Sequence, residues 1–275
     1  MNITNKLQKI KAKYHYSFVL LRQLVITDFK LRYQGSLLGY LWSLLRPLAI
    51  FAILYIVFVD FLRLGHEVPH YAIYLLLGIV LWNYFAEVSN NGVSSIVGKG
   101  DLLRKLNFPR YVVVLSGSFS ALINLLINLI VVGVFILLFG ADPSPSAIFM
   151  VPLLIIELFV FAIAIAFILS TLFVRLRDIN YIWEVIMQGA FYATPIIYPL
   201  SYIHNDLAVR LLMLSPIAQI IQDMRYVLVT TQEGTIGTLY DNELMRLVPI
   251  GIVLLLAVIG AYFFKKRSPY FAEDI

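Results

Sequence analysis

Six long apolar stretches fill most of the 275 residues, and they restrict the chain to a membrane fold. A helix needs roughly 20 apolar residues to cross the hydrocarbon core of a bilayer, about 30 Å thick, because each residue advances it by about 1.5 Å. Long apolar runs without two-residue alternation indicate helices and not a β-barrel. The sequence therefore predicts an all-α integral membrane protein with six transmembrane helices. We place these spans at Leu37–Phe61, Tyr71–Ser89, Tyr111–Phe139, Ile148–Val174, Tyr181–Leu200 and Leu247–Phe264.

The fifth predicted span is the least regular, because Gly189, Pro195 and Pro199 interrupt it. The segment Met213–Leu228 that follows is moderately apolar but carries several polar and charged residues. Irregular backbone at membrane depth is stable only inside protein or beside water. We therefore expect re-entrant helices on the external side in this part of the chain, and no seventh span.

Basic residues concentrate on one side of the predicted membrane. Most of the 21 lysine and arginine residues fall in the N-terminal segment, in the second-to-third and fourth-to-fifth connections, and in the C-terminal tail. Because cytoplasmic segments carry this excess, both termini are predicted to be cytoplasmic. The chain then divides into a cytoplasmic segment (1–36), a transmembrane domain (37–264) and a cytoplasmic tail (265–275). The same asymmetry accounts for the net charge of +5 without a nucleic-acid partner.

The N-terminal segment contains a candidate amphipathic helix around Tyr16–Ile26. Phe18, Leu21, Val25 and Phe29 share one helical face, and most neighbouring polar residues lie off it. Such a stripe is typical of a helix that lies along the membrane interface.

No motif for catalysis or metal binding stands out. The chain has no cysteine, which excludes disulfides and thiolate chemistry. The Gly92–Gly100 segment lacks the glycine spacing and the Ser or Thr of a phosphate-binding loop. His66 and His70 flank Pro69 in a predicted external loop, which does not favour a metal site. We expect no catalytic residue, metal or cofactor in this chain.

Polar and aromatic residues in the spans leave two interpretations open. Arg46, beside Pro47 in the first span, is either a cation that meets an anionic substrate or an arginine that extends to the interface. The chain has 17 Tyr, 19 Phe and 3 Trp, several near predicted span ends. These rings either form interfacial belts or stack on sugar rings along a transport path.

The second cytoplasmic connection, Gly100–Pro109, is predicted to form a short amphipathic helix. Its residues Leu102, Leu103 and Leu106, with Phe108, are too few to span a membrane but enough to seat in a groove on a cytoplasmic partner. The alternative is a helix that rests on the membrane surface. A chain without an energy-coupling motif needs a separate motor if it pumps, which favours the partner.

Three sequence blocks resemble the polysaccharide-exporting ABC-2 permeases, the membrane subunits that export O-antigen, teichoic acid, capsule and cell-wall rhamnan. The first block is Thr27–Ser43 followed by Arg46-Pro47-Leu48. The second is Asp101–Pro109, which is similar to the coupling-helix region of that family. The third is Arg177-Asp178-Ile179 with Phe191–Pro199. The similarity runs over nearly the full chain.

This resemblance implies the ABC-2 permease fold and a homodimer in the cytoplasmic membrane of a bacterium, with two copies of a separate cassette ATPase that binds ATP and Mg. The implied substrate is a glycan on a polyprenyl diphosphate lipid. The implied ATPase-coupling residues are Asp101, Leu102, Leu103, Arg104, Lys105, Leu106 and Phe108. The diphosphate candidates at the entrance are Lys30, Arg32 and Arg46, and the aromatic candidates along the glycan path are Tyr40, Trp42, Phe191, Tyr192 and Tyr198.

Two other functions remain open from the sequence. An ABC-2 exporter of small drugs or lipids would share this architecture. A membrane-embedded transferase acting on lipid-linked sugars would need a carboxylate or histidine constellation, which the scattered residues here do not offer.

Overall fold

The computed structural model describes residues 3–33, 35, 38–63, 68–105, 108–231 and 234–271, and for residues 3–15, 32 and 33 the backbone alone. Within these ranges the chain is helical and has no strand, as the sequence predicts. The helices are α1 (Ile3–Tyr33), α2 (Trp42–Tyr55), α3 (Tyr71–Gly98), α4 (Gly100–Lys105), α5 (Tyr111–Phe139), α6 (Ala147–Arg175), α7 (Ile179–Ala193), α8 (Asp206–Met213), α9 (Pro216–Leu228), α10 (Ile236–Leu239) and α11 (Leu247–Arg267). Short turns η1 (Gly39–Leu41) and η2 (Ile56–Phe61) extend α2, and η3 (Leu200–Tyr202), η4 (Glu243–Arg246) and η5 (Ser268–Tyr270) lie farther along the chain.

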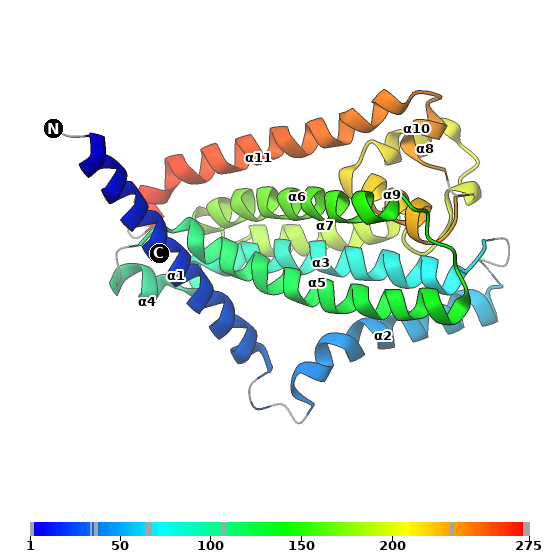
Figure 1. The fold of residues 1–275 in the computed structure, drawn as a ribbon, viewed down its shortest axis with the longest axis horizontal. Coiled ribbons are helices and arrows are strands. Elements are labelled where there is room, and N and C mark those ends of the chain that lie inside the picture. Colours follow the sequence, from blue (N-terminus) through cyan, green and yellow to red (C-terminus); the bar gives the residue numbers. More distant parts are fainter. Residues whose placement is uncertain are drawn as a thin grey trace.

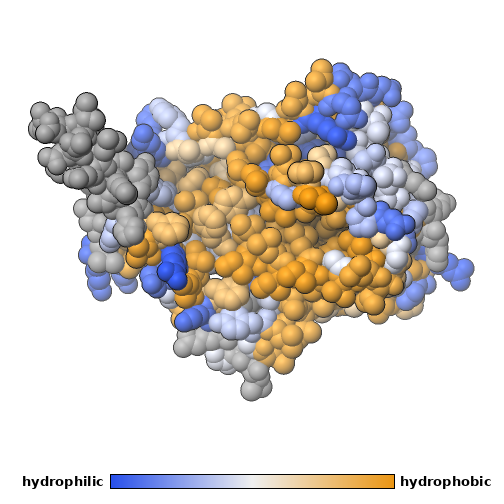
Figure 2. Space-filling view, in the orientation of Figure 1, coloured by the Kyte–Doolittle hydropathy of each residue, from blue (hydrophilic) through white to orange (hydrophobic). Residues whose placement is uncertain are grey.

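Five helical segments of the described chain are long and apolar enough to cross a membrane. They are Gly39–Phe61, Tyr71–Gly98, Tyr111–Phe139, Ala147–Arg175 and Glu243–Tyr270. They confirm five of the six predicted spans and mark the chain as an integral membrane protein. Their apolar side chains are widely exposed, Leu137 by 83% and Phe149 by 81% for example. Figure 2 shows the resulting apolar surface between more hydrophilic ends, as expected of a protein solvated by lipid.

The prediction of a fifth span over Tyr181–Leu200 is wrong in its extent. The helix there, α7, has 15 residues and ends at Ala193. Thr194 is extended (φ −78°, ψ 138°), because a proline at the next position disfavours the helical conformation. Pro195 also lacks the N–H that a continued helix needs. The helix therefore stops just before Pro195, whereas Gly189, which was also expected to interrupt it, lies inside α7.

The expected re-entrant region is a bent pair of helices. The axes of α8 and α9 differ by 95° across a short break, so the pair is either a broken span or a re-entrant loop. Pro216 opens α9 at a position where a proline is compatible with a helix start. In Figure 1, α8, α9 and α10 gather at one end of the bundle, and α4 lies at the opposite end, together with the end of α11.

The centre of the bundle is α3, which contacts α5, α6, α7 and α9. Its most apolar window is 83% buried, compared with 0% for the span that contains α2. Small residues allow α6 to approach its neighbours closely. A Cβ on Gly92 of α3 would lie 2.6 Å from the Cβ of Ala166, and one on Gly260 of α11 would lie 2.7 Å from the carbonyl of Ala164. Close packing at small residues is a common way for membrane helices to associate.

The N-terminal helix is longer than predicted and turns a different face to the bundle. α1 has 31 residues and packs on α5. Ser17 is buried and Leu21 and Leu24 pack on the core, whereas Phe18 is 67% exposed. Residues 17, 21, 24 and 28 recur at helical spacing, so the contact face includes Asp28. The predicted apolar face is therefore divided: Leu21 packs on the bundle and Phe18 is exposed, and the contact of this face with the membrane interface stays a prediction.

Candidate functional site

The predicted coupling helix exists as α4, directly after Lys99, the C-cap residue of α3. Asp101, Arg104 and Lys105 of α4 are exposed, and Leu102 is half-buried. Leu103 and Phe108 are each only 7% exposed and belong to the core of this chain. In this conformation these two side chains hold the connection against its own bundle, and their contact with a partner stays a prediction. Leu106, the remaining predicted contact, lies outside the described residues.

A groove of about 950 Å³ lies beside α4, between the start of α5 and the end of α11. Its described lining includes four basic residues, Arg104, Lys105, Arg110 and Lys265, and none of the described lining residues is a carboxylate. Its apolar lining includes Leu103, Phe108, Phe167 and Phe264. The Arg110 guanidinium donates a hydrogen bond to the Ser268 carbonyl, which ties α5 to the turn after α11. This end of the molecule thus presents a positively charged surface.

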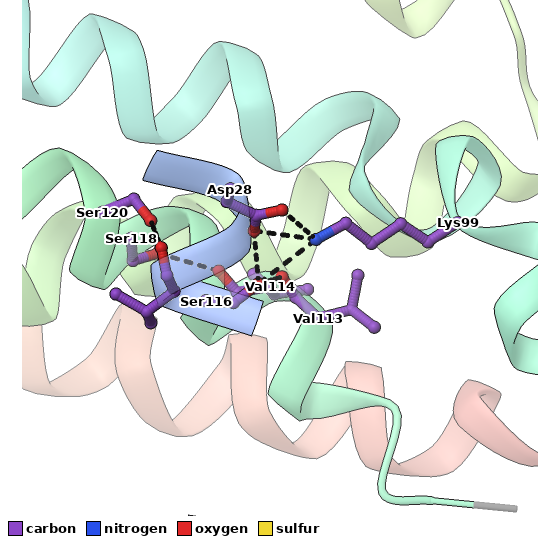
Figure 3. A network of polar contacts seen from close by, with 8 residues as sticks. Asp28, Lys99, Val113, Val114, Ser116, Ser118 and Ser120 are labelled. Carbon is purple, nitrogen blue, oxygen red and sulfur yellow. Dashed lines mark hydrogen bonds and ion pairs between the residues drawn. The ribbon is translucent and has the colours of Figure 1, made fainter. Parts of the chain in front are cut away.

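A polar network joins α1 to the same end of the bundle (Figure 3). The Lys99 ammonium donates to both carboxylate oxygens of Asp28, at 2.9 and 2.8 Å, and Ser116 Oγ of α5 donates to Asp28 Oδ2 at 3.0 Å. Both members of the ion pair are largely shielded from solvent, with side chains 28% and 23% exposed. Ser120 Oγ reaches the Val25 carbonyl of α1 at 3.4 Å. Since Lys99 directly precedes α4, this ion pair links the start of α4 to α1.

A second cavity of about 690 Å³ lies between α2, α3 and α5. Trp42, Arg46, Asn90 and Asn91 are exposed and form its mouth. Its remaining polar lining is Ser43, Asn83, Tyr84, Glu87, Asn124 and Asn128. Polar side chains are costly in a membrane and usually face a polar path or partner. We therefore treat this cavity as the candidate substrate site.

The floor of the cavity is partly fixed by hydrogen bonds. The Asn128 amide donates to the carbonyls of Asn124, at 2.8 Å, and Ser43, at 3.2 Å, so it links α5 to the start of α2. The Asn124 amide approaches Glu87 Oε1 at 3.5 Å. The Asn124 side-chain oxygen and the Tyr84 hydroxyl are both buried and have no hydrogen-bond partner in the described part of the chain.

The residues predicted from the sequence include only Trp42 and Arg46 of this cavity, although a polar stripe in the sequence also indicates it. Positions 83, 87, 90 and 91 are polar and fall on one face of α3 by their spacing, and Asn124 and Asn128 are one turn apart on α5. A polar stripe inside an apolar span predicts a buried polar surface. Only the tertiary packing identifies its neighbours on α2.

The structure separates the predicted entrance residues. Arg46 lines the cavity, whereas Lys30 is exposed on α1 and is not among the lining residues. The Arg32 side chain lies outside the described residues. Of the aromatic candidates, Trp42 lines the mouth, and Tyr40 is half-exposed and stacks on Phe29 with ring centres 5.1 Å apart.

The other three aromatic candidates gather where α7 ends. Phe191 packs edge-on against Trp82, with ring centres 5.8 Å apart, and Tyr192 is 69% exposed. The Tyr198 hydroxyl donates to the carbonyls of Tyr192 and Ala193, each at 3.0 Å. Burial raises the pKa of this hydroxyl, so it remains a donor at neutral pH. These residues do not line the cavity, so the predicted aromatic path falls into two separate groups.

A buried arginine holds the irregular segment after α7 against the bundle. Arg225 of α9 is 0% exposed. Its guanidinium donates to the carbonyls of Pro195 at 2.6 Å, Ile196 at 2.7 Å and Tyr74 at 3.2 Å. Its central carbon lies 3.4 Å from the centre of the Tyr74 ring. Arg225 thus satisfies carbonyl groups where the helical pattern of α7 has ended. In the sequence alone, Arg225 is only one of several polar interruptions of an apolar segment.

The chain belongs to the ABC-2 type transporter family, whose family model matches residues 19–229. It is therefore a transporter component and not an enzyme. The chain is also similar to proteins named O-antigen export system permease protein RfbA. Two from Klebsiella pneumoniae are 31% and 29% identical over 266 residues, which is 96% of this chain and 98% of each relative. One from Myxococcus xanthus is 29% identical over 268 residues, 97% of this chain and 98% of the relative.

Proposed function

We propose that this chain is the permease subunit of an exporter that moves a polyprenyl-diphosphate-linked polysaccharide outward across a bacterial cytoplasmic membrane. The observation that carries the proposal is its similarity, over nearly its whole length, to permeases named for O-antigen export. The polar cavity between α2, α3 and α5 supports it, because a hydrophilic glycan needs polar side chains inside the membrane. The basic surface at α4 is in keeping with the predicted cytoplasmic orientation of that end.

A separate cassette ATPase supplies the energy in this proposal and docks at α4. The exposed residues Asp101, Arg104 and Lys105 are the contacts that α4 offers, whereas Leu103 keeps α4 attached to the bundle. A shift of α4 caused by ATP binding pulls on Lys99 and so on Asp28 of α1. Because α1 leads through η1 into α2, the movement reaches the helix that borders the cavity.

The transporter acts as a homodimer in this proposal, with two ATPase copies. The exposed helix α7 supports the pairing. α7 has one buried residue, Met187, and exposes Glu184 and Gln188. An acidic side chain inside a membrane needs a polar environment. A second copy of this chain, with a water-filled path between the two, provides that environment.

The test is purification of the tagged full-length chain from its source bacterium, with assay of ATP hydrolysis in the purified complex. We expect a cassette ATPase to co-purify. The double variant Arg104→Glu/Lys105→Glu should lower the yield of this ATPase at least tenfold, because it reverses the charge of the exposed α4 surface. Lys30→Glu is the matched control, since it reverses an exposed basic residue on α1 and should leave the yield unchanged.

Two outcomes would contradict the proposal. Undiminished recovery of the ATPase with the double variant would remove α4 as the docking site. If deletion of the gene left surface polysaccharide unchanged but abolished drug efflux, the substrate would be a small molecule and not a glycan.

A further inference from the structure

We propose that the cavity between α2, α3 and α5 binds an uncharged sugar unit of the exported glycan and not its diphosphate. The inference rests on the proposed function and assigns to this cavity one part of that substrate. A volume of about 690 Å³ falls within the roughly 300–1,000 Å³ that is usual for small-molecule sites. The cavity therefore suits a few chemical groups of a polymer and not a long segment of it.

The charge of the lining argues against a diphosphate. Among the described lining residues Arg46 is the one cation and Glu87 the one carboxylate, so this lining is close to neutral overall. Diphosphates carry several negative charges and are held by clusters of Arg and Lys or by free N–H groups at helix starts. The N–H of Trp42, where α2 begins, already bonds to the Gly39 carbonyl. Glu87 would in addition repel an anion.

The chemistry of the lining instead matches hydroxyl groups. Five asparagines contribute, and each amide both donates and accepts hydrogen bonds, as a sugar hydroxyl does. They are Asn83, Asn90, Asn91, Asn124 and Asn128. Asn124 and Tyr84 line this cavity and are more than nine-tenths buried, and the Asn124 side-chain oxygen and the Tyr84 hydroxyl have no partner within the described chain. A sugar hydroxyl bound beside either residue would supply the missing partner, whereas buried polar atoms are otherwise nearly always paired.

An aromatic ring stands at the mouth of the same cavity. Trp42 is 48% exposed, so part of its indole is available for contact. Indole offers a flat apolar face beside a polar edge, which fits the C–H face of a sugar ring. Amides in the floor and an indole at the mouth together describe a site for a neutral sugar.

The test measures ligand binding by the fluorescence of Trp42 in the purified full-length permease. The chain has three tryptophans, so Trp82→Phe and Trp183→Phe leave Trp42 as the single reporter. The probes are a rhamnose trisaccharide, a mannose trisaccharide and inorganic pyrophosphate, with glycerol at equal osmolality as the baseline. We expect at least one trisaccharide to produce a saturable change and pyrophosphate to produce none.

Variants then assign the response to the cavity. Asn124→Leu removes the unpaired oxygen at nearly constant volume and should raise the trisaccharide Kd at least tenfold. Asn180→Leu on α7, which is exposed and does not line the cavity, is the matched control and should change the Kd less than twofold. Arg46→Gln should preserve sugar binding within about threefold, because the site recognises hydroxyl groups and not charge. Gel filtration and circular dichroism establish that each variant is folded.

Saturable pyrophosphate binding that Arg46→Gln abolishes would overturn the inference, and so would the absence of any saturable response to either trisaccharide. Neither result affects the proposed function, which co-purification of the ATPase and surface polysaccharide test separately. Conversely, loss of the proposed function with intact sugar binding would leave a glycan-binding membrane protein that lacks the predicted motor.

Discussion

Replacement of Arg225 by methionine should destabilise the protein by about 3–5 kcal/mol, because hydrogen bonds from a charged donor contribute about 1.5–3 kcal/mol each and several are lost together. The carbonyls of Pro195 and Ile196 lose their donor, and the Tyr74 carbonyl, which lies inside α3, loses an additional one. Each buried group left without a partner costs about 1–3 kcal/mol, and the contact with the Tyr74 ring adds about 2 kcal/mol. Filling the space with methionine recovers part of this loss.

The assay is thermal unfolding of the purified chain in detergent, followed by gel filtration. At roughly 2–4 °C per kcal/mol for chains near this size, Arg225→Met should lower Tm by on the order of 10 °C. Arg210→Ala is the control, because the Arg210 guanidinium lies 5.2 Å from the Tyr240 ring at an exposed site and should contribute little.

A second substitution tests the same contact from the opposite side. A Cβ on Gly78 would lie 2.5 Å from Nη2 of Arg225 and 3.3 Å from the Ile196 carbonyl. Arg225 cannot move aside without losing its hydrogen bonds, so Gly78→Ala should also be destabilising. The destabilisation of the double variant should be smaller than the sum of the two single destabilisations, because methionine can bend away from the new methyl group. Unchanged Tm in Arg225→Met, or strict additivity in the double variant, would refute this account of the arginine.

Three further predictions concern the packing of α1, α3 and α7. Asp28→Asn and Lys99→Met should each destabilise the protein. A double-mutant cycle by thermal unfolding should give a coupling free energy of about 1–3 kcal/mol between the two positions. Additive effects would show that the ion pair is not formed. Gly92→Leu should lower the free energy of unfolding by about 1–3 kcal/mol, because the larger side chain forces α3 away from Ala166. Gly98→Ala is the control and should be near neutral by the same measurement, because nothing lies within 4 Å of its added Cβ. Tyr198→Phe should cost about 0.5–1.5 kcal/mol through the lost hydroxyl, with an unchanged Tm as the contrary result.

The sequence was sufficient where local composition determines the structure. Apolar length identifies five of the spans, although α3 continues nine residues beyond its predicted end at Ser89, and Pro195 already indicated that the predicted span over Tyr181–Leu200 would be irregular. The end of α7 follows locally from Pro195, whereas the position of the segment after it depends on the contacts of Arg225 with the Pro195 and Ile196 carbonyls. Those contacts join residues far apart in the chain, so no local pattern reveals them.

The candidate site was predicted less completely for the same reason. The position of α4 follows from its pattern, but the direction of Leu103 depends on the arrangement of α5 and α11 around it. Likewise, Arg46 could be recognised as a polar residue in a span, but not its neighbours Asn124 and Asn128, which lie on a helix far along the chain. Asp28 belongs to the first of the three sequence blocks that resemble the family, but its ion pair with Lys99 could not be predicted from the sequence.

The most direct test of the proposed transport mechanism is the movement of lipid-linked glycan in proteoliposomes that contain this permease with and without its ATPase. The mechanism predicts ATP-dependent transfer of glycan across the bilayer with the complete complex, and none with the permease alone or with the Arg104→Glu/Lys105→Glu variant. Net transfer by the isolated permease, or full transport by the variant, would contradict the claim that a partner bound at α4 drives export.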